Sequence, residues 1–150
     1  MSGPIAIRPT DDFERVRELG IAAGLESGDR HDEQVVVAWG AYDDGDLIGG
    51  ITLSRYQGRL DVVNWMSIAE SHRGRGIAAR LLATLEDEAR RRGISALWVT
   101  ARAPGFFLSQ GYERVGEGVE RDILLGTCPE CEQYGVTCDP QAMRKVLGES

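Results

Sequence analysis

The most constraining feature of this chain is a short loop of glycine and arginine between a strand-like run and a helix-like run. Residues 60–68 are apolar enough for a strand, residues 73–76 read Arg-Gly-Arg-Gly, and residues 76–92 repeat apolar side chains at helical spacing. Glycine lets successive backbone N–H groups turn to one side, and the helix adds its positive end. The loop therefore predicts a phosphate-binding site, and the paired Arg73 and Arg75 indicate more than one phosphate. A plain solvated turn would need neither the flanking pattern nor paired arginines.

The composition limits the classes of function. A chain of 150 residues suits one domain, and the excess of 24 acidic over 17 basic residues gives a net charge of −7. A nucleic-acid-binding surface should be basic, so we expect no nucleic-acid partner. No apolar run reaches the roughly 18 residues of a membrane helix, and the N-terminus lacks an apolar signal core. We therefore expect a cytoplasmic protein without a membrane partner. A homodimer is one option for its assembly.

The periodicity predicts strands and helices in the order β-α-βββ-α-β-α-β, which excludes an all-helical or all-β protein. A helix is expected after Thr10 or Asp11, and further helices over residues 76–92 and 105–110. Strands are expected at residues 5–8, 34–42, 47–56, 60–68 and 96–101, with one or two more between 112 and 125.

Three sequence blocks resemble one protein family. Arg73-x-x-Gly76-x-Ala78 resembles the Gln/Arg-x-x-Gly-x-Gly/Ala signature of the GCN5-related N-acetyltransferases (GNAT), and residues 106–112, Phe-Phe-Leu-Ser-Gln-Gly-Tyr, are similar to that family's Phe-Tyr-x-x-x-Gly-Phe. The opening Ile-Ala-Ile-Arg-Pro-Thr-Asp of residues 5–11 looks like the family's first strand. The resemblance spans roughly residues 5–125.

The resemblance implies a mixed α/β (α+β) fold. Its centre would be a mixed, mostly antiparallel sheet of six to seven strands, flanked by about four helices, with a splay between the fourth and fifth strands. Residues 1–125 would form the acetyltransferase domain. Residues 126–150 would form a cysteine-containing tail packed on the same domain.

The resemblance also implies that acetyl-coenzyme A (acetyl-CoA) is the cosubstrate. A backbone N–H of Ile68, or of the adjacent Ser67, would stabilise the oxyanion, a contribution of about 3–4 kcal/mol. No cysteine lies near the expected cleft, so direct transfer in a ternary complex is expected. The residues expected to bind the cosubstrate are Ser67, Ile68, Arg73, Gly74, Arg75, Gly76, Ile77, Ala78 and Phe107.

The group that takes the proton from the acceptor amine is less defined. Asp61 and Glu70 stand at strand ends, and Glu33 is an alternative from a loop. For each of the three, a plain surface carboxylate is the alternative, and the residue types alone favour it. Asn64 and Trp65, inside the apolar run, are candidate acceptor-binding residues, and a satisfied core amide is the alternative for Asn64.

Phe107 departs from the family pattern, because many members carry a tyrosine there that donates a proton to the leaving thiolate. A thiol with a pKa of about 8.5 leaves readily without such help. Water or Ser109 could serve as the donor instead. His72 abuts the loop and either contacts the coenzyme or faces water.

The paired phenylalanines and the tail also resemble short, stand-alone N-acetylglutamate synthases. This resemblance suggests an amino-acid acceptor such as glutamate, whose carboxylate Arg55, Arg59 or Arg102 could bind if these are not plain surface charges. The tail residues Cys128, Cys131 and Cys138 could hold zinc, but a structural zinc needs a fourth ligand such as Asp139. Free thiols or a disulfide are the alternatives.

The expected function is thus acetyl transfer to a small amine or amino acid. Two rival functions remain open at this point. One is a non-catalytic acyl-CoA sensor, because the base is not identified and Phe107 has no proton to give. The other is a peptide or protein N-acetyltransferase, which would require an open groove.

Overall fold

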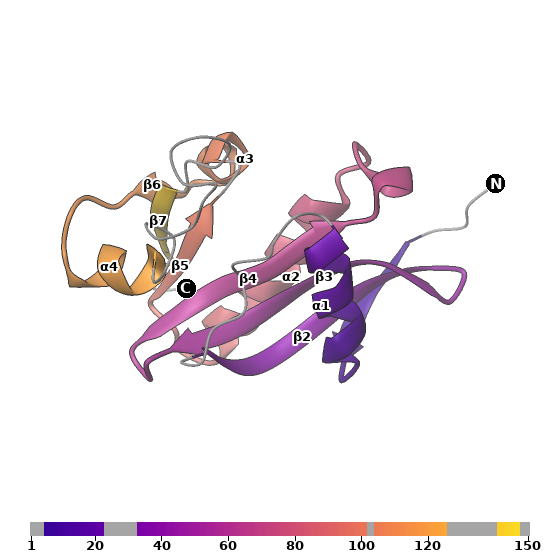
Figure 1. Ribbon diagram of the computed structural model, residues 1–150, viewed down its shortest axis with the longest axis horizontal. Helices are drawn as coiled ribbons and strands as arrows, with labels where there is room; N and C mark the ends of the chain where they lie inside the picture. Colours follow the sequence, from indigo (N-terminus) through magenta and orange to yellow (C-terminus); the bar gives the residue numbers. More distant parts are fainter. Residues whose placement is uncertain (1–4, 23–32, 102–103, 126–140, 148–150) are drawn as a thin grey trace.

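The computed structural model describes residues 5–22, 33–101, 104–125 and 141–147. The chain mixes strands and helices, with β2, β3 and β4 in succession, as the periodicity predicted (Figure 1). In order, the elements are β1 (Ala6–Thr10), α1 (Phe13–Ala22), β2 (Glu33–Asp43), β3 (Asp46–Tyr56), β4 (Leu60–Ile68), a 3₁₀ turn η2 (Glu70–His72), α2 (Ile77–Arg91), β5 (Ala96–Ala101), α3 (Pro104–Ser109), β6 (Glu113–Arg114), α4 (Val119–Leu125) and β7 (Gln141–Val146).

The strands form one seven-stranded sheet in the order β1-β2-β3-β4-β5-β7-β6. All described pairs are antiparallel except β4 with β5, which run parallel. These two strands are in register only at Val62 and Trp98, and they separate beyond that pair. The predicted mixed, mostly antiparallel sheet and its splay between the fourth and fifth strands are confirmed.

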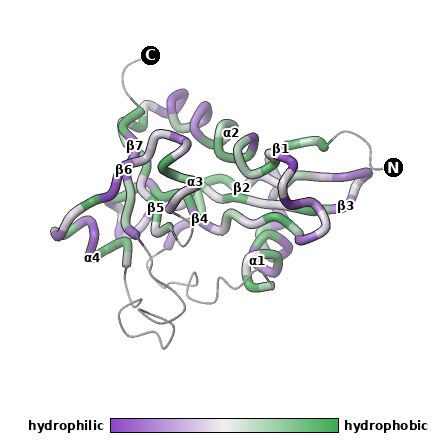
Figure 2. The backbone as a smooth tube through the Cα atoms, turned by 90° about the horizontal axis from the view of Figure 1, so that it is seen from above, coloured by the Kyte–Doolittle hydropathy of each residue, from purple (hydrophilic) through white to green (hydrophobic). Residues whose placement is uncertain are grey.

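Helices α1 and α2 cover opposite faces of the sheet (Figure 2). A Cβ placed on Gly50 would lie 2.8 Å from Val16 of α1, so this face of β3 approaches α1 very closely. The neighbouring Ile51 packs in the cluster that contains Leu81 and Leu85 of α2. Because successive strand residues point to opposite faces, the two helices sandwich the sheet.

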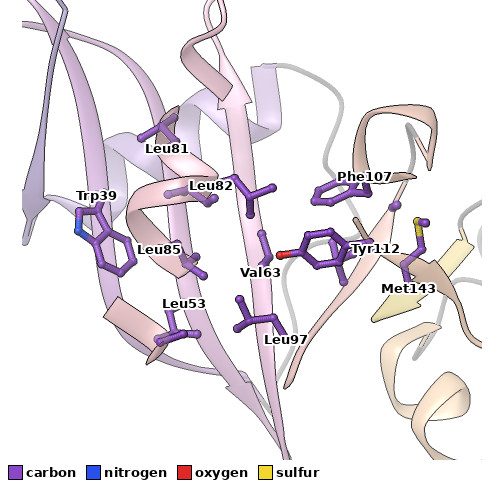
Figure 3. Packing of buried hydrophobic residues seen from close by; sticks show 14 of the residues in the cluster. Trp39, Leu53, Val63, Leu81, Leu82, Leu85, Leu97, Phe107, Tyr112 and Met143 are labelled. Carbon is purple, nitrogen blue, oxygen red and sulfur yellow. The ribbon is translucent and has the colours of Figure 1, made fainter. Parts of the chain in front are cut away.

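The main core lies between α2 and the sheet. The apolar face of α2 is fully buried against side chains of the central strands, and Phe107, Tyr112 and Met143 extend the cluster beyond Val63 (Figure 3). This continuous core holds α2, and therefore the loop that precedes it, in a fixed position against β4.

Of the one or two strands expected between residues 112 and 125, one is present, and the end of the segment is helical. Residues 119–125 form α4, not a final strand, and the strand after Gly111 has only two residues. In the helix, Ile123 and Leu124 are both buried, in one cluster with Tyr56 and Leu60. A strand would have pointed these two side chains to opposite faces.

Strand β7 had not been expected from the sequence. It inserts between β5 and β6, and Met143 at its centre is fully buried. The chain after residue 140 thus supplies an interior strand of the sheet, while the domain boundary at residue 125 stays a prediction.

Candidate active site

The loop before α2 has the backbone geometry of an anion site. Gly74 and Gly76 have φ angles of 80° and 76°. These values lie in the left-handed region, which residues other than glycine adopt only at a cost in free energy. Gly76 is the N-cap residue of α2, and no side chain in the described part caps that helix. Its first-turn N–H groups are therefore open to a ligand, and the helix dipole favours a negative one.

The two arginines of the loop are solvent-exposed. Arg73 turns back toward the preceding strand, where its Nε donates a 3.1 Å hydrogen bond to the carbonyl oxygen of Ile68. The contact ties the end of β4 to the start of the anion loop, residues 73–76. The Arg73 side chain thus both fixes the loop relative to β4 and supplies positive charge beside it.

His72 has a partner of its own. Its Nε2 lies 2.7 Å from Oδ2 of Asp43, at the end of β2, and its Nδ1 lies 2.7 Å from Oγ of Ser71. The ring therefore neither faces water alone nor points freely into the loop. It joins the β2–β3 hairpin to the segment that precedes the anion loop.

Strand β4 bulges within its length, at the edge of the splay. Gly50 pairs with Ser67, whereas Thr52 pairs with Asn64, so that Trp65 and Met66 together lie opposite a single residue of β3. Trp65 has a φ of 52°, a rare backbone conformation for a bulky residue. The bulge residues Trp65 and Met66 lie two to three positions before Ile68. Their backbone N–H groups are therefore candidate oxyanion donors in addition to the N–H group of Ile68.

Ser67 and Ile68 follow the bulge in regular register with Gly50 and Gly49. The Ser67 hydroxyl is buried and has no hydrogen-bond partner among the described residues. A buried hydroxyl without a partner costs free energy, so Ser67 is a candidate donor to a group that enters the splay.

Glu33, at the start of β2, is the centre of a polar cluster on the α1 face of the sheet. Its Oε2 accepts hydrogen bonds from Ser54 Oγ at 2.6 Å and from Asn64 Nδ2 at 2.9 Å, and its Oε1 accepts one from Trp65 Nε1 at 3.2 Å. Phe13 of α1 contacts the Trp65 ring edge to face, with ring centroids 6.1 Å apart. The fold thus brings together three of the predicted residues, Glu33, Asn64 and Trp65.

Thr52 and Ser54 belong to the same cluster and were missed by the sequence reasoning. Both are fully buried, and their hydroxyl oxygens are 2.9 Å apart. Their spacing of two residues within an apolar strand places them on one face. That spacing was the available signal, because two buried hydroxyls on one face require a polar partner.

The other two carboxylates are not part of this cluster. Asp61 forms an ion pair with Arg55, with 3.0 Å between Oδ1 and Nη2. Glu70 lies exposed in η2. Within the described structure, the hydrogen bonds from Asn64 Nδ2 and Trp65 Nε1 go to Glu33 and not to Asp61 or Glu70.

Phe107 is buried in the core. Its ring makes edge-to-face contacts with Phe106 and Tyr112, with centroids 5.2 and 5.3 Å apart. The Ser109 hydroxyl donates to the carbonyl oxygen of Phe106, so it is already engaged. A coenzyme contact by Phe107 stays a prediction.

Several predicted residues lie outside the described ranges: Arg102, Asp139, Cys128, Cys131 and Cys138. Within the described ranges, no group of three His, Cys, Asp or Glu side chains could hold a metal ion. No helix in that part of the chain is long and apolar enough to cross a membrane.

The fold and loop define a class of protein, in which a sheet opens beside a glycine-rich anion loop at a helix N-terminus. A family model described as "Acetyltransferase (GNAT) family" matches residues 6–112. The chain belongs to this family, as the sequence motifs predicted.

Two curated proteins are similar in sequence. Streptothricin acetyltransferase from Streptomyces lavendulae is 33% identical over 110 residues, which cover 70% of this chain and 57% of that protein. Acetyltransferase Atu2258 from Agrobacterium fabrum is 36% identical over 74 residues, which cover 49% of this chain and 52% of that protein. The matches thus span little more than half the length of these relatives.

Solved structures show the same fold at low sequence identity. N-acetylglutamate synthase from Neisseria gonorrhoeae, complexed with coenzyme A and N-acetyl-glutamate, matches 99% of this chain and 36% of its own with a TM-score of 0.68 and 19% identity. A GNAT acetyltransferase from Staphylococcus aureus Mu50 matches 97% of this chain and 100% of its own, with a TM-score of 0.67 and 14% identity.

Proposed function

We propose that this protein is an acetyl-CoA-dependent N-acetyltransferase that acetylates the amine of a small molecule by direct transfer in a ternary complex. The observation that carries this proposal is the pair of left-handed glycines, Gly74 and Gly76, before the uncapped N-terminus of α2. This anion site lies where the chain leaves β4, the strand that splays from β5. Membership of the family supports the same conclusion.

The residues of the loop fit the diphosphate of acetyl-CoA. Backbone N–H groups between Arg73 and Ala78 would hold its oxygens, and the two loop arginines would balance its charge. Side chains at positions 74 and 76 would strain the backbone, so the cradle depends on glycine. Acetyl-CoA supplies the activated acetyl group as a thioester.

In the proposed reaction, the neutral amine attacks the thioester carbonyl carbon. A C–N bond forms, the C–S bond breaks, and the proton released from nitrogen ends on the coenzyme thiolate or in water. Main-chain N–H groups at the end of β4, at Ser67 or Ile68 or in the bulge before them, would stabilise the oxyanion. Phe107 cannot donate to the thiolate and Ser109 is engaged, so water is the proposed donor.

The proposed acceptor is a small-molecule amine. The curated relative named for streptothricin and the fold neighbour bound to N-acetyl-glutamate support a small acceptor. Glutamate enters through the resemblance of residues 106–112 and of the tail to stand-alone N-acetylglutamate synthases. It is therefore one member of the acceptor panel to be tested.

Zinc binding by Cys128, Cys131 and Cys138 stays a separate prediction. Elemental analysis of protein purified without added metal should find about one zinc per chain if these thiolates are ligands. A metal-free protein with three reactive thiols would refute zinc binding. This result bears on the tail alone and not on acetyl transfer.

Two measurements test the proposed function. Calorimetric titration should detect binding of acetyl-CoA, and a thiol-release assay should detect free coenzyme A in the presence of amino acids, polyamines or aminoglycosides. Tight binding without release on any amine would identify a non-catalytic acyl-CoA sensor. Absence of binding would refute the proposal altogether.

A further inference from the structure

We infer that the Glu33 carboxylate binds a cationic group of the acceptor, so that the protein acetylates diamines and other basic amines in preference to acidic amino acids. This inference rests on the proposed function and names the substrate class of the same site. It follows from the hydrogen bonds of Glu33, from its charge balance and from its place beside the bulge of β4.

The described residues hold the Glu33 carboxylate firmly, but they do not use all of its hydrogen-bonding capacity. An ionised carboxylate offers about four lone-pair positions to donors. Three are used: two on Oε2, by Ser54 and Asn64, and one on Oε1, by Trp65. Among the described residues, no donor takes the remaining position on Oε1, while the rest of the carboxylate is fixed. A group oriented in this way suits recognition of a ligand cation.

The charge of Glu33 is not balanced within the described structure. Its three donors are all neutral, and no cationic side chain of the described residues pairs with it. Other shielded carboxylates do have such partners: Glu86 pairs with Lys145, and Asp61 with Arg55. A half-buried charge without a counter-charge is costly, and a bound ammonium or guanidinium group would offset that cost.

The position of Glu33 connects it to the reaction. Its partners Asn64 and Trp65 lie directly before Met66, Ser67 and Ile68, the stretch of β4 that carries the candidate oxyanion donors. An acceptor cation at Oε1 would thus lie beside the bulge.

The same surroundings disfavour an acidic acceptor. A glutamate carboxylate needs a cation. Arg55 follows Ser54 in β3 and so points to the opposite face of the sheet, where it is paired with Asp61. Arg59 lies exposed in the turn between β3 and β4. Near Glu33 a second carboxylate would meet like charge, which costs free energy in a partly shielded site.

The test compares acceptors in the full chain with saturating acetyl-CoA. Putrescine and cadaverine should give lower KM values than L-glutamate, by at least tenfold. Glu33→Gln should raise the KM for the two diamines at least tenfold and leave the Kd for acetyl-CoA unchanged. Higher ionic strength should raise the diamine KM of the wild type and have less effect on the variant.

Two further variants separate charge from structural damage. Glu33→Asp keeps the charge and should retain part of the diamine selectivity, whereas Glu113→Gln removes an exposed carboxylate of β6 and should change nothing. The melting temperature and the Kd for acetyl-CoA report whether each variant is folded.

The outcomes are distinct. An unchanged diamine KM in folded Glu33→Gln, or a wild-type preference for glutamate over diamines, overturns the inference and leaves the proposed function intact. Coenzyme binding without acetylation of any amine overturns the proposed function, and the inference with it.

Discussion

The hydroxyl group of Tyr112 donates a 2.9 Å hydrogen bond to Oε2 of Glu86, and both side chains are buried. Lys145 Nζ lies 3.2 Å from each oxygen of the same carboxylate. These hydrogen bonds join α2 to β7 and to the turn that follows α3. The tyrosine of the second sequence motif therefore anchors the C-terminal part of the sheet to the helix that follows the anion loop.

Replacing Tyr112 by phenylalanine should destabilise the fold. The buried Glu86 carboxylate would lose a neutral donor, and a hydrogen bond to a charged group contributes about 1.5–3 kcal/mol. Urea unfolding should show a loss of this size with an unchanged slope. A loss below about 0.5 kcal/mol would mean that Lys145 alone satisfies Glu86.

The same tyrosine predicts a dependence of stability on alkaline pH. Burial, with the Glu86 charge as a second cause, raises the pKa of the Tyr112 hydroxyl far above its usual value. Above about pH 10 the unfolded chain loses this proton while the folded chain keeps it, so the free energy of unfolding should fall as pH rises. The fall should be smaller in Tyr112→Phe, measured by urea unfolding between pH 8 and pH 11.

Gly76→Asp should abolish acetyl-CoA binding, because it places a negative group in the anion loop. Asn is a matched control, because Asn and Asp both tolerate the left-handed conformation and only Asp is charged. Gly76→Asn should therefore bind more tightly than Gly76→Asp by at least tenfold in calorimetry. Retained affinity in the aspartate variant would show that another loop holds the phosphates.

Phe107→Tyr should leave turnover per folded molecule unchanged or raise it, because the family's usual proton donor is restored. Its effect on stability should be unfavourable, since Phe107 is buried between two aromatic rings and a hydroxyl without a partner costs about 1–3 kcal/mol there. Thermal unfolding and thiol release measure the two effects separately. A large loss of turnover in stable protein would mean that the ring packs against substrate.

Ser67→Ala should separate stability from activity. Removing a buried hydroxyl that lacks a partner should leave the free energy of unfolding unchanged or raise it. Turnover should fall about tenfold or more if the hydroxyl donates to the reacting group. Unchanged turnover would assign the hydroxyl no part in the reaction.

The anion loop and the central strands could be predicted because their signals are local. Glycines between a strand pattern and a helix pattern specify the conformation of residues 73–78, and the apolar runs at residues 47–56 and 60–68 mark two strands. By contrast, α4 and β7 are short, and their packing against distant residues decides their conformation. Local patterning could not specify either.

The cluster around Glu33 depends on the tertiary fold. Glu33 and Asn64 are 31 positions apart. Glu33 of β2 pairs with Tyr56 of β3 and Asn64 of β4 pairs with Thr52, so the two side chains meet diagonally across β3. The positive φ of Trp65 directs its indole N–H to the same carboxylate, and no sequence pattern marks a bulky residue for that conformation. Glu33 was considered only as an alternative because these contacts are non-local.

The single register pair between Val62 and Trp98 leaves a seam inside the sheet. Along a seam, main-chain amides and carbonyls that would normally bond to a neighbouring strand require another partner. A ligand that inserts there is recognised by atoms that every amino acid carries, so substitution of the surrounding side chains need not abolish its binding. With such recognition, a fold can bind the same cosubstrate even when the residues that face the acceptor are replaced.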